Sequence, residues 1–343
     1  MQNLRNILSI LADGHFHSGE ALAERLNVSR TAVWKQIRRL SQQYNIPVQA
    51  VQGRGYRLPT PIELLEADKV VAGLARESRE QLGKLQVEWS LDSTNQWLME
   101  ARDVPCGTVV VAEHQRRGRG RRGREWVSPL GTNLYFSLLW CFQGPPANLS
   151  GLSLAVAVSV VRALSTLGVN GLGLKWPNDI LWQDKKLCGI LLELQGEAGG
   201  PCRVVCGVGL NVYMPDTAAA AIDQPWTDLR HVLQRPVSRQ QLLIALLDEL
   251  LPAMPRYEQD GLQPFLDDWR RWDVVAGKPV QLLLPQRTVR GRAQGIDTQG
   301  NLLIEHNGTR ERYCSGEISL RTCLLYTSPS PRDRTRSRMP SSA

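Results

Sequence analysis

The sequence has no hydrophobic run long enough to cross a membrane. Its longest apolar stretches, such as 152–164, are interrupted by serine and arginine well short of the roughly 20 residues that a spanning helix needs. The first residues, MQNLRNILSILADG, follow an amphipathic helical pattern and contain no signal-peptide cleavage site. We therefore expect no membrane partner and a cytoplasmic location.

Metal-binding patterns are also lacking. The seven cysteines are an odd number, and Cys202 and Cys206 have neither a second cysteine pair nor a histidine nearby, so no zinc site is expected. The cysteines in apolar, strand-like context, which include Cys141 and Cys188, are predicted to be buried and reduced. The sequence predicts no metal held by protein ligands alone.

Neither an internal repeat nor an overall excess of charged residues is present. Charged residues make up 22% of the chain and hydrophobic residues 42%, which excludes a coiled-coil rod and a disordered polyelectrolyte. At 343 residues, the chain is long enough for two or three globular units of roughly 100–200 residues each.

The net charge of +8 is concentrated at the two ends of the chain. Residues 1–60 carry +5 and residues 324–343 carry +3, so the segment between them is neutral. Because 324–343 is rich in Ser, Pro and Arg and has no hydrophobic period, we expect a disordered, non-native tail there. A basic folded domain on a neutral, enzyme-sized body is typical of a nucleic-acid-binding module attached to an enzyme.

Residues 1–60 have the pattern of a winged helix-turn-helix domain. Three helices are predicted, with Ser18 and Ser29 as caps of the second and the basic third. Two short strands around Gly53-Arg54-Gly55 form a wing, and Pro59-Thr60-Pro61 is a stiff linker. The predicted DNA-binding residues are Ser29, Arg30, Thr31, Lys35, Arg38, Arg39, Arg54 and Arg57. Alternatively, the domain only packs against the body and regulates loop closure there.

The body divides into two further units. Residues 63–272 alternate strand and helix patterns, with strand candidates such as 109–114, 133–140 and 203–212, which predicts a mixed α/β catalytic domain within an α+β protein. Residues 273–323 contain short strands separated by glycine-rich turns and predict a small β-barrel.

The most unusual segment is QRRGRGRRGREW, residues 115–126, which follows a strong strand. By composition alone, the segment is as typical of a solvated or RNA-binding loop as of a ligand-binding loop. The run is short and lies between strand-like segments, and its three glycines let the backbone approach a ligand closely. Guanidinium groups match phosphate oxygens in geometry, so an ordered loop of this kind suits a polyphosphate, with Trp126 available to stack on a ring.

Two lysine motifs follow. In KWPND (175–179), Pro177 ends a strand and the following Asn-Asp turn keeps Lys175 near Asp179, either as an ordinary ion pair or as a phosphate and magnesium site. In DKKLCGILLE (184–193), lysines in a turn are usually only solvated. Lys186, however, directly precedes the apolar run and is placed to project into a pocket.

Two weaker motifs complete the set. In DSTNQW (92–97), Asp92 or Ser93 is by default a helix cap, although the same short polar groups can bind a planar polar head group. In GVGLN (207–211), glycines in a strand often only permit close packing.

Together these segments resemble the bifunctional biotin protein ligase/biotin operon repressor family. The resemblance runs over 1–323, in order: winged helix-turn-helix, DSTN, the GRGRRGR loop, KWPND, the DKKLCGIL segment, GVGLN and a terminal GEISLR. It implies an α+β fold with a biotin/lipoate-ligase-type central domain and an SH3-like C-terminal barrel. The GRGRRGR loop, KWPND and GIL in this order are highly specific.

The resemblance implies a two-step reaction. Biotin and ATP, with Mg²⁺, form biotinyl-5′-AMP and pyrophosphate, and the adenylate then acylates one lysine of a biotin carboxyl carrier protein. It also implies a homodimer that binds operator DNA with the adenylate as corepressor. Arginines and a lysine suit step one, because they screen the repulsion between a carboxylate and a polyanion.

The resemblance also implies roles for individual residues. The predicted catalytic residues are Arg121, Lys175, Asp179 and Lys186. Those predicted to bind biotin are Ser93, Thr94, Asn95, Gln115, Arg119, Gly120, Arg121, Trp126, Lys186 and Gly189. Those predicted to bind ATP are Arg121, Arg122, Arg124, Lys175, Asn178, Asn211 and Arg321.

Some positions depart from the family pattern. Arg117 stands where a small residue is common, His114 stands where an aromatic residue is common, and the unusual tail follows almost directly after Arg321. Two alternatives stay open: a lipoate or octanoate ligase on the same scaffold, and a biotin-sensing repressor without catalytic activity. The intact arginine loop disfavours the first, and the presence of Arg121, Lys175 and Lys186 disfavours the second.

Overall fold

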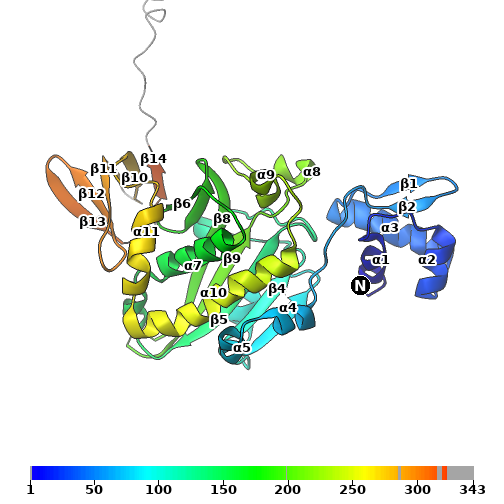
Figure 1. The fold of residues 1–343 in the computed structure, drawn as a ribbon, viewed down its shortest axis with the longest axis horizontal. Coiled ribbons are helices and arrows are strands. Elements are labelled where there is room, and N and C mark those ends of the chain that lie inside the picture. Colours follow the sequence, from blue (N-terminus) through cyan, green and yellow to red (C-terminus); the bar gives the residue numbers. More distant parts are fainter. Residues whose placement is uncertain (1, 198, 285–286, 315–318, 323–343) are drawn as a thin grey trace, which may run out of the picture.

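A computed structural model describes residues 2–197, 199–284, 287–314 and 319–322. The predicted tail at 324–343 lies outside the described residues. Figure 1 shows a small N-terminal unit set apart from a larger body, with a group of short strands on the body's far side. The α+β fold class expected from the sequence is confirmed.

The N-terminal unit is the expected winged helix-turn-helix. Its elements are α1 (Gln2–Leu11), α2 (Gly19–Leu26), α3 (Arg30–Tyr44), β1 (Gln49–Val51) and β2 (Gly55–Arg57). The Oγ atoms of Ser18 and Ser29 accept hydrogen bonds from the backbone N–H of Ala21 and Ala32, so both predicted caps begin helices. The antiparallel pair β1–β2 is the wing.

The centre of the body is a seven-stranded sheet. Its strand order is β3-β4-β5-β9-β8-β7-β6, with β3 parallel to β4 and every other neighbouring pair antiparallel. The strands are β3 (Lys84–Glu88), β4 (Thr108–Ala112), β5 (Leu134–Phe142), β6 (Leu172–Lys175), β7 (Asp179–Trp182), β8 (Lys185–Gly196) and β9 (Cys202–Leu210).

Helices cover the sheet unequally. The long helices α7 (Leu152–Thr166) and α10 (Arg239–Asp260) pack against each other across one face, where the main hydrophobic core lies (Figure 1). The short α6 (Thr94–Glu100) packs on β4, β5 and β9, around the smaller cluster that contains Leu98 and Val205. The remaining helical segments are α4 (Ala67–Gly73), α5 (Arg76–Gln81), η1 (Arg121–Gly123), η2 (Pro146–Leu149), α8 (Asp216–Ala219), α9 (Leu229–Leu233), η3 (Gln263–Phe265) and α11 (Leu266–Trp272).

One stretch has the length and composition of a membrane-spanning helix. In the described part of the chain only Pro146–Thr166 meets that test, and 67% of it is buried inside the body. It is longer than the apolar run apparent in the sequence because it includes η2 and the two-residue turn before α7. Its burial against the sheet and α10 gives it the role of a core helix.

The C-terminal strands form the expected antiparallel unit, in the order β13-β12-β11-β10-β14. Val280 and Ile304 belong to the same hydrophobic core as α7, and the indole N–H of Trp176 donates to the carbonyl of Gly300 at 3.1 Å. The unit is therefore packed against the catalytic body and joined to the KWPND motif. Its strands are β10 (Pro279–Leu283), β11 (Thr288–Ile296), β12 (Leu302–His306), β13 (Thr309–Tyr313) and β14 (Ser319–Thr322).

The cysteine prediction is correct for most strand cysteines. Cys188, Cys202 and Cys206 are free and buried, whereas Cys141 is only half-buried, next to the exposed Cys106. Burial raises the pKa of the Cys206 thiol to about 12, which keeps it protonated and unreactive.

Candidate active site

A cavity of about 870 Å³ lies between the Arg/Gly loop, the KWPND turn and the facing parts of β8 and β9. Every predicted ligase residue except Arg321 lines it. These residues are Ser93, Thr94, Asn95, Gln115, Arg119, Gly120, Arg121, Arg122, Arg124, Trp126, Lys175, Asn178, Asp179, Lys186, Gly189 and Asn211. Arg321 lies on β14, where its backbone is paired with Gln281, but its side chain is outside the described residues. Leu320, its neighbour, reaches the cavity.

One end of the cavity is a hydrogen-bonded polar network. Gln115 Oε1 accepts from the backbone N–H of Thr94 at 2.9 Å and from its hydroxyl at 3.2 Å. Ser137 Oγ, on β5 and buried, lies 2.7 Å from Thr94 Oγ1 and 2.6 Å from Asn95 Oδ1. Ser93 is the N-cap of α6, as expected by default from the sequence, and it lines the cavity as well. The short polar groups of DSTN are thereby fixed in one orientation.

The middle of the cavity is shaped by glycines. A Cβ at position 209 would lie 2.6 Å from the ring of Trp126, and one at 189 would lie 3.0 Å from the same ring. A Cβ at 207 would collide with the side chain of Asn95. The glycines of GVGLN therefore make room for two predicted ligand-binding side chains. The indole N–H of Trp126 is buried without a hydrogen-bond partner, which leaves a donor for a ligand.

Lys186 and Asp179 form an ion pair beside Trp126. Lys186 Nζ lies 2.8 Å from Asp179 Oδ1, and the two side chains are 17% and 24% exposed. The ammonium also lies 5.4 Å from the centre of the Trp126 ring. The sequence placed Lys175 near Asp179, and the two are indeed opposite each other in the β6–β7 pairing. The ion pair of Asp179, however, is made with Lys186 from the next strand.

The backbone of Lys186 is held on both sides by a segment that the sequence motifs did not reveal. Its N–H donates to the carbonyl of Pro225 at 2.9 Å, and its carbonyl accepts from Thr227 at 2.9 Å. The stretch 221–226 lines the cavity along with Met214. Its hydrogen bond to Lys186 is made by a backbone carbonyl, and the segment contains neither a charge run nor a glycine-rich pattern that would mark it in the sequence.

The Arg/Gly loop is ordered by a tight turn and by polar contacts of its arginines. Arg122 and Gly123 have φ of 58° and 70°, and the N–H of Arg124 reaches the carbonyl of Arg121 at 3.4 Å, which is the geometry of a type I′ turn. Arg121 donates to Asn178 Oδ1 at 3.3 Å, and Arg119 to Glu193 Oε1 at 3.3 Å. Burial lowers the pKa of the Arg121 guanidinium, and the nearby Asp179 opposes that shift.

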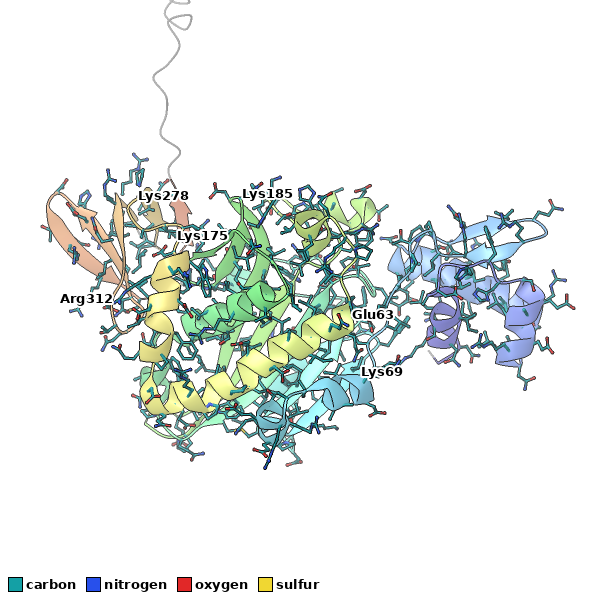
Figure 2. All side chains as sticks on the ribbon, viewed as in Figure 1. Glu63, Lys69, Lys175, Lys185, Lys278 and Arg312 are labelled. Carbon is teal, nitrogen blue, oxygen red and sulfur yellow. The ribbon has the colours of Figure 1, made fainter. Side chains whose placement is uncertain are left out.

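A buried charge network joins the loop region to the interdomain linker. Arg239 and Glu113, 3% and 4% exposed, form an ion pair of 2.8 Å. Arg239 also donates to the carbonyl of Glu63 at 2.6 Å and to that of Asn133 at 3.0 Å. Figure 2 shows Glu63 where the linker meets the start of α10. Glu63, which follows the linker, is thus connected through Arg239 to Glu113, two positions before Gln115. No sequence motif predicted this connection.

An aromatic cluster lies at the contact between the N-terminal domain and the body. Tyr44, at the end of α3, packs edge-on against Trp89 and His114 with ring centres 5.9 and 5.2 Å apart. The indole N–H of Trp89 donates to the Tyr44 hydroxyl at 3.2 Å, and Ser90 Oγ lies 2.9 Å from His114 Nδ1. His114, noted as a departure from the family pattern, therefore lies at the domain contact and next to Gln115.

The predicted DNA-binding residues lie on α3 and the wing. Arg30, Thr31, Lys35, Arg38 and Arg39 are exposed side chains of α3, whereas the Ser29 hydroxyl caps the helix. On the wing, the Arg54 and Arg57 guanidinium carbons lie 4.2 and 4.7 Å from the ring centre of Phe16. Stacking on Phe16 restricts the positions of both guanidinium groups on the wing.

Comparisons with known proteins match each unit in turn. Residues 87–211 match the biotin/lipoate A/B protein ligase family, residues 3–57 a helix-turn-helix domain, and residues 275–321 the biotin protein ligase C-terminal domain. The solved biotin protein ligase from Aquifex aeolicus in complex with biotin and ATP aligns with a TM-score of 0.61 at 29% identity, covering 70% of this chain and 99% of that one. Fold and site thus define a biotin-type protein ligase that carries a DNA-binding domain.

Relatives that match nearly the whole chain identify the family within this class of ligases. The chain is 41% identical to the bifunctional ligase/repressor BirA of Salmonella typhimurium, over 92% of this chain and 97% of that protein. It is 32% identical to the protein of the same name from Bacillus subtilis, over 90% and 95%. The chain belongs to this family of bifunctional biotin ligases and repressors.

Proposed function

We propose that the protein joins biotin to ATP, releases pyrophosphate, and passes biotin from biotinyl-5′-AMP to a lysine of the carrier protein of acetyl-CoA carboxylase. The observation that supports this most strongly is the cavity itself. It collects five separate sequence motifs around one lysine–aspartate pair, with a polar network at one end and arginines at the other. Such a site suits a ligand with a planar polar head, an apolar chain and an anionic end.

The polar network is assigned to the ureido head of biotin. Gln115, Ser93 and Thr94 offer a mixed set of donors and acceptors there, and Ser137 and Asn95 hold them in place. Trp126 and the glycines of β8 and β9 would flank the apolar tail. A site that uses fixed hydrogen bonds discriminates strongly against a ligand that lacks the matching groups.

Lys186 is assigned to the biotin carboxylate and then to the phosphate of the adenylate. In step one a carboxylate oxygen attacks the α-phosphorus and pyrophosphate leaves, so negative charge accumulates near this lysine. Arg121, Arg122 and Arg124 would neutralise the phosphates. In step two the carrier amine attacks the mixed anhydride, AMP leaves, and the amine loses a proton. The ordered loop would shield the adenylate from water.

Magnesium fits this site as a partner of the nucleotide rather than of the protein. Within the described ranges, no group of three or more His, Cys, Asp or Glu side chains is placed to hold a metal ion. Asp179 and Asp184 do line the cavity, and Mg²⁺ is commonly held by one or two carboxylates together with substrate phosphates. When bound, it would lower the charge repulsion between nucleotide and carboxylate.

The N-terminal domain is proposed to bind the operator of the biotin biosynthesis genes, as a homodimer with biotinyl-5′-AMP as corepressor, in the cytoplasm. We propose the working domain limits 1–60, 63–272 and 273–323. The exposed arginines of α3 and the wing support DNA binding, and the contact of Tyr44 with His114 supports communication between ligand and DNA sites.

The test is the reaction itself. The full chain is mixed with MgATP, a biotin carrier domain and either biotin or lipoate, and the intact mass of the carrier is measured. We expect one biotin adduct and no lipoyl adduct. A lipoyl adduct would mean that the polar network does not select the ureido head group of biotin. Tight biotin binding without any adduct would identify a sensor repressor without ligase activity.

A further inference from the structure

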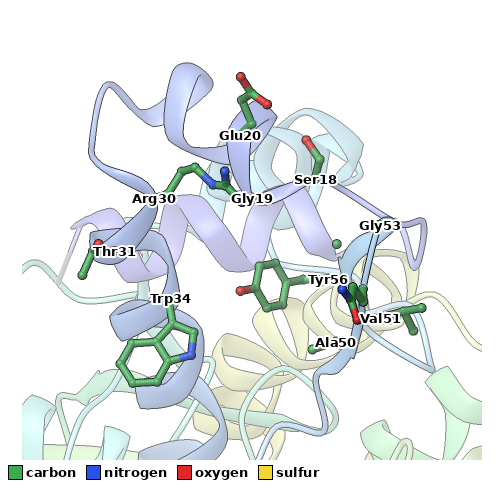
Figure 3. Close-up of a pocket in the computed structure, with 12 residues that line it drawn as sticks. Ser18, Gly19, Glu20, Arg30, Thr31, Trp34, Ala50, Val51, Gly53 and Tyr56 are labelled. Carbon is green, nitrogen blue, oxygen red and sulfur yellow. The ribbon is translucent and has the colours of Figure 1, made fainter.

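We propose that Trp34 reads thymine: its indole contacts the C5-methyl group of a T in the major groove and so helps to set the operator sequence. The proposal rests on the repressor function. Trp34 is 48% exposed. Among the described residues only three large hydrophobic side chains are exposed, and two of them, Trp34 and Val51, line the same groove between α3 and the wing (Figure 3).

Helical spacing places Trp34 at the centre of the exposed face of α3. Arg30 and Arg38 lie four residues to either side and Thr31 lies three residues before it, so all four share one face. Val33, Ile37 and Leu40 are buried on the opposite side. Trp34 is the fifth residue of the helix, in the half that approaches base edges in helix-turn-helix complexes.

The charges around the groove fit duplex DNA. The Arg38 guanidinium carbon lies 5.4 Å from the centre of the Trp34 ring, and Arg30 lines the same groove. Among the described residues, Glu20 is the one acidic residue that lines it, and the wing arginines stacked on Phe16 do not. Arg30 and Arg38 would contact the phosphate backbone beside the groove, while Trp34 would face the bases.

The chemistry of indole selects the base. Its single N–H donor and lack of an acceptor exclude the two-point hydrogen bonding that reads guanine or adenine. Its large apolar surface matches the thymine methyl, the apolar group on the major-groove edge of the base pairs. Val51 lies on the opposite wall of the groove and would extend the same apolar surface (Figure 3).

The experiment begins with selection of a binding duplex from a random library, using the full chain with biotin and MgATP. Each thymine of the selected site is then replaced singly by deoxyuridine, which removes only the methyl group. We expect one position per half-site where the affinity falls about fourfold, the value for one buried methyl group. In Trp34→Ala, overall affinity falls about tenfold, and the deoxyuridine substitution has no further effect.

Two variants act as controls. Arg38→Ala should weaken binding, lower the salt dependence by about one phosphate contact, and keep the preference for thymine. Asn3→Ala, an exposed change on α1 that does not line the groove, should change neither property. If a duplex is selected but Trp34→Ala keeps full discrimination against deoxyuridine, the role of Trp34 is overturned and repression stands. If no duplex is selected although the adenylate is formed, the repressor function itself fails, and the proposal with it.

Discussion

At the scale of single residues, the space in the cavity depends on the glycines of β9, which have no side chain to fill it. Gly209 faces the indole of Trp126, and any Cβ there would enter its van der Waals surface. We expect Gly209→Ala to weaken biotin binding by about 1–3 kcal/mol, because the ring must shift. Gly199→Ala, where a Cβ would meet nothing within 4 Å, should leave binding unchanged. Titration calorimetry of both variants decides this.

Lys186 offers the second test at this scale. In Lys186→Ala, Asp179 loses its 2.8 Å partner and the carboxylate of biotin loses its cation. We expect pyrophosphate release to fall by about 10²–10³-fold while the circular dichroism spectrum stays native. Lys185→Ala, one position away and exposed, is the matched control and should stay active. Normal pyrophosphate release from a well-folded Lys186→Ala would remove this lysine from the reaction.

At the scale of elements, the Arg/Gly loop is tied to β8 by Glu193, which accepts from Arg119 at 3.3 Å and from Asn95 at 2.8 Å. The substitution Glu193→Gln keeps the shape of the side chain and removes its negative charge. Since the side chains of the Arg119–Glu193 pair are 39% and 27% exposed, we expect a loss of about 0.5–1 kcal/mol, or a two- to fivefold faster release of biotinyl-5′-AMP.

Release is measured by trapping the freed adenylate after one turnover. Glu197→Gln, exposed on the loop that follows β8, is the control. Equal release rates for the two variants would mean that the Arg119–Glu193 pair does not hold the loop over its product.

The same loop explains why the site was largely predictable from the sequence. The functional residues of the loop, like those of KWPND, are consecutive in the sequence. Such a local pattern can be recognised without knowing the fold. Pro225 holds Lys186 through a backbone carbonyl, and Arg239 pairs with Glu113, which is distant from it in the sequence. Neither contact has a local signature. The partner of Asp179 was missed for the same reason, because pairing of β7 with β8 decides it.

At the scale of the whole molecule, His114 makes the domain contact sensitive to pH. Burial, with a smaller effect from Arg116, lowers the pKa of His114 from 6.5 to about 4. Between those values the unfolded chain binds a proton that the folded chain does not, so the free energy of unfolding falls as the pH drops from 6.5 to 4. We expect His114 to contribute about 1–2 kcal/mol to this loss, since the ring is partly exposed.

Urea unfolding at pH 6.5 and pH 5 measures this contribution. His114→Gln should have a flatter pH dependence than the unsubstituted protein. An equal slope in the two proteins would show that the histidine at the domain contact is not the group that titrates.

The aromatic contact between the domains also bears on attempts to cut the protein down to its ligase. Trp89 and Leu130 belong to the body, yet they are 8% and 2% exposed and cluster with the N-terminal helices. A fragment that starts after the linker would present an indole and a leucine to solvent beside His114, one residue from the glutamine of the polar network. A ligase fragment without the N-terminal domain therefore needs polar replacements at both positions before it stays monodisperse at high concentration.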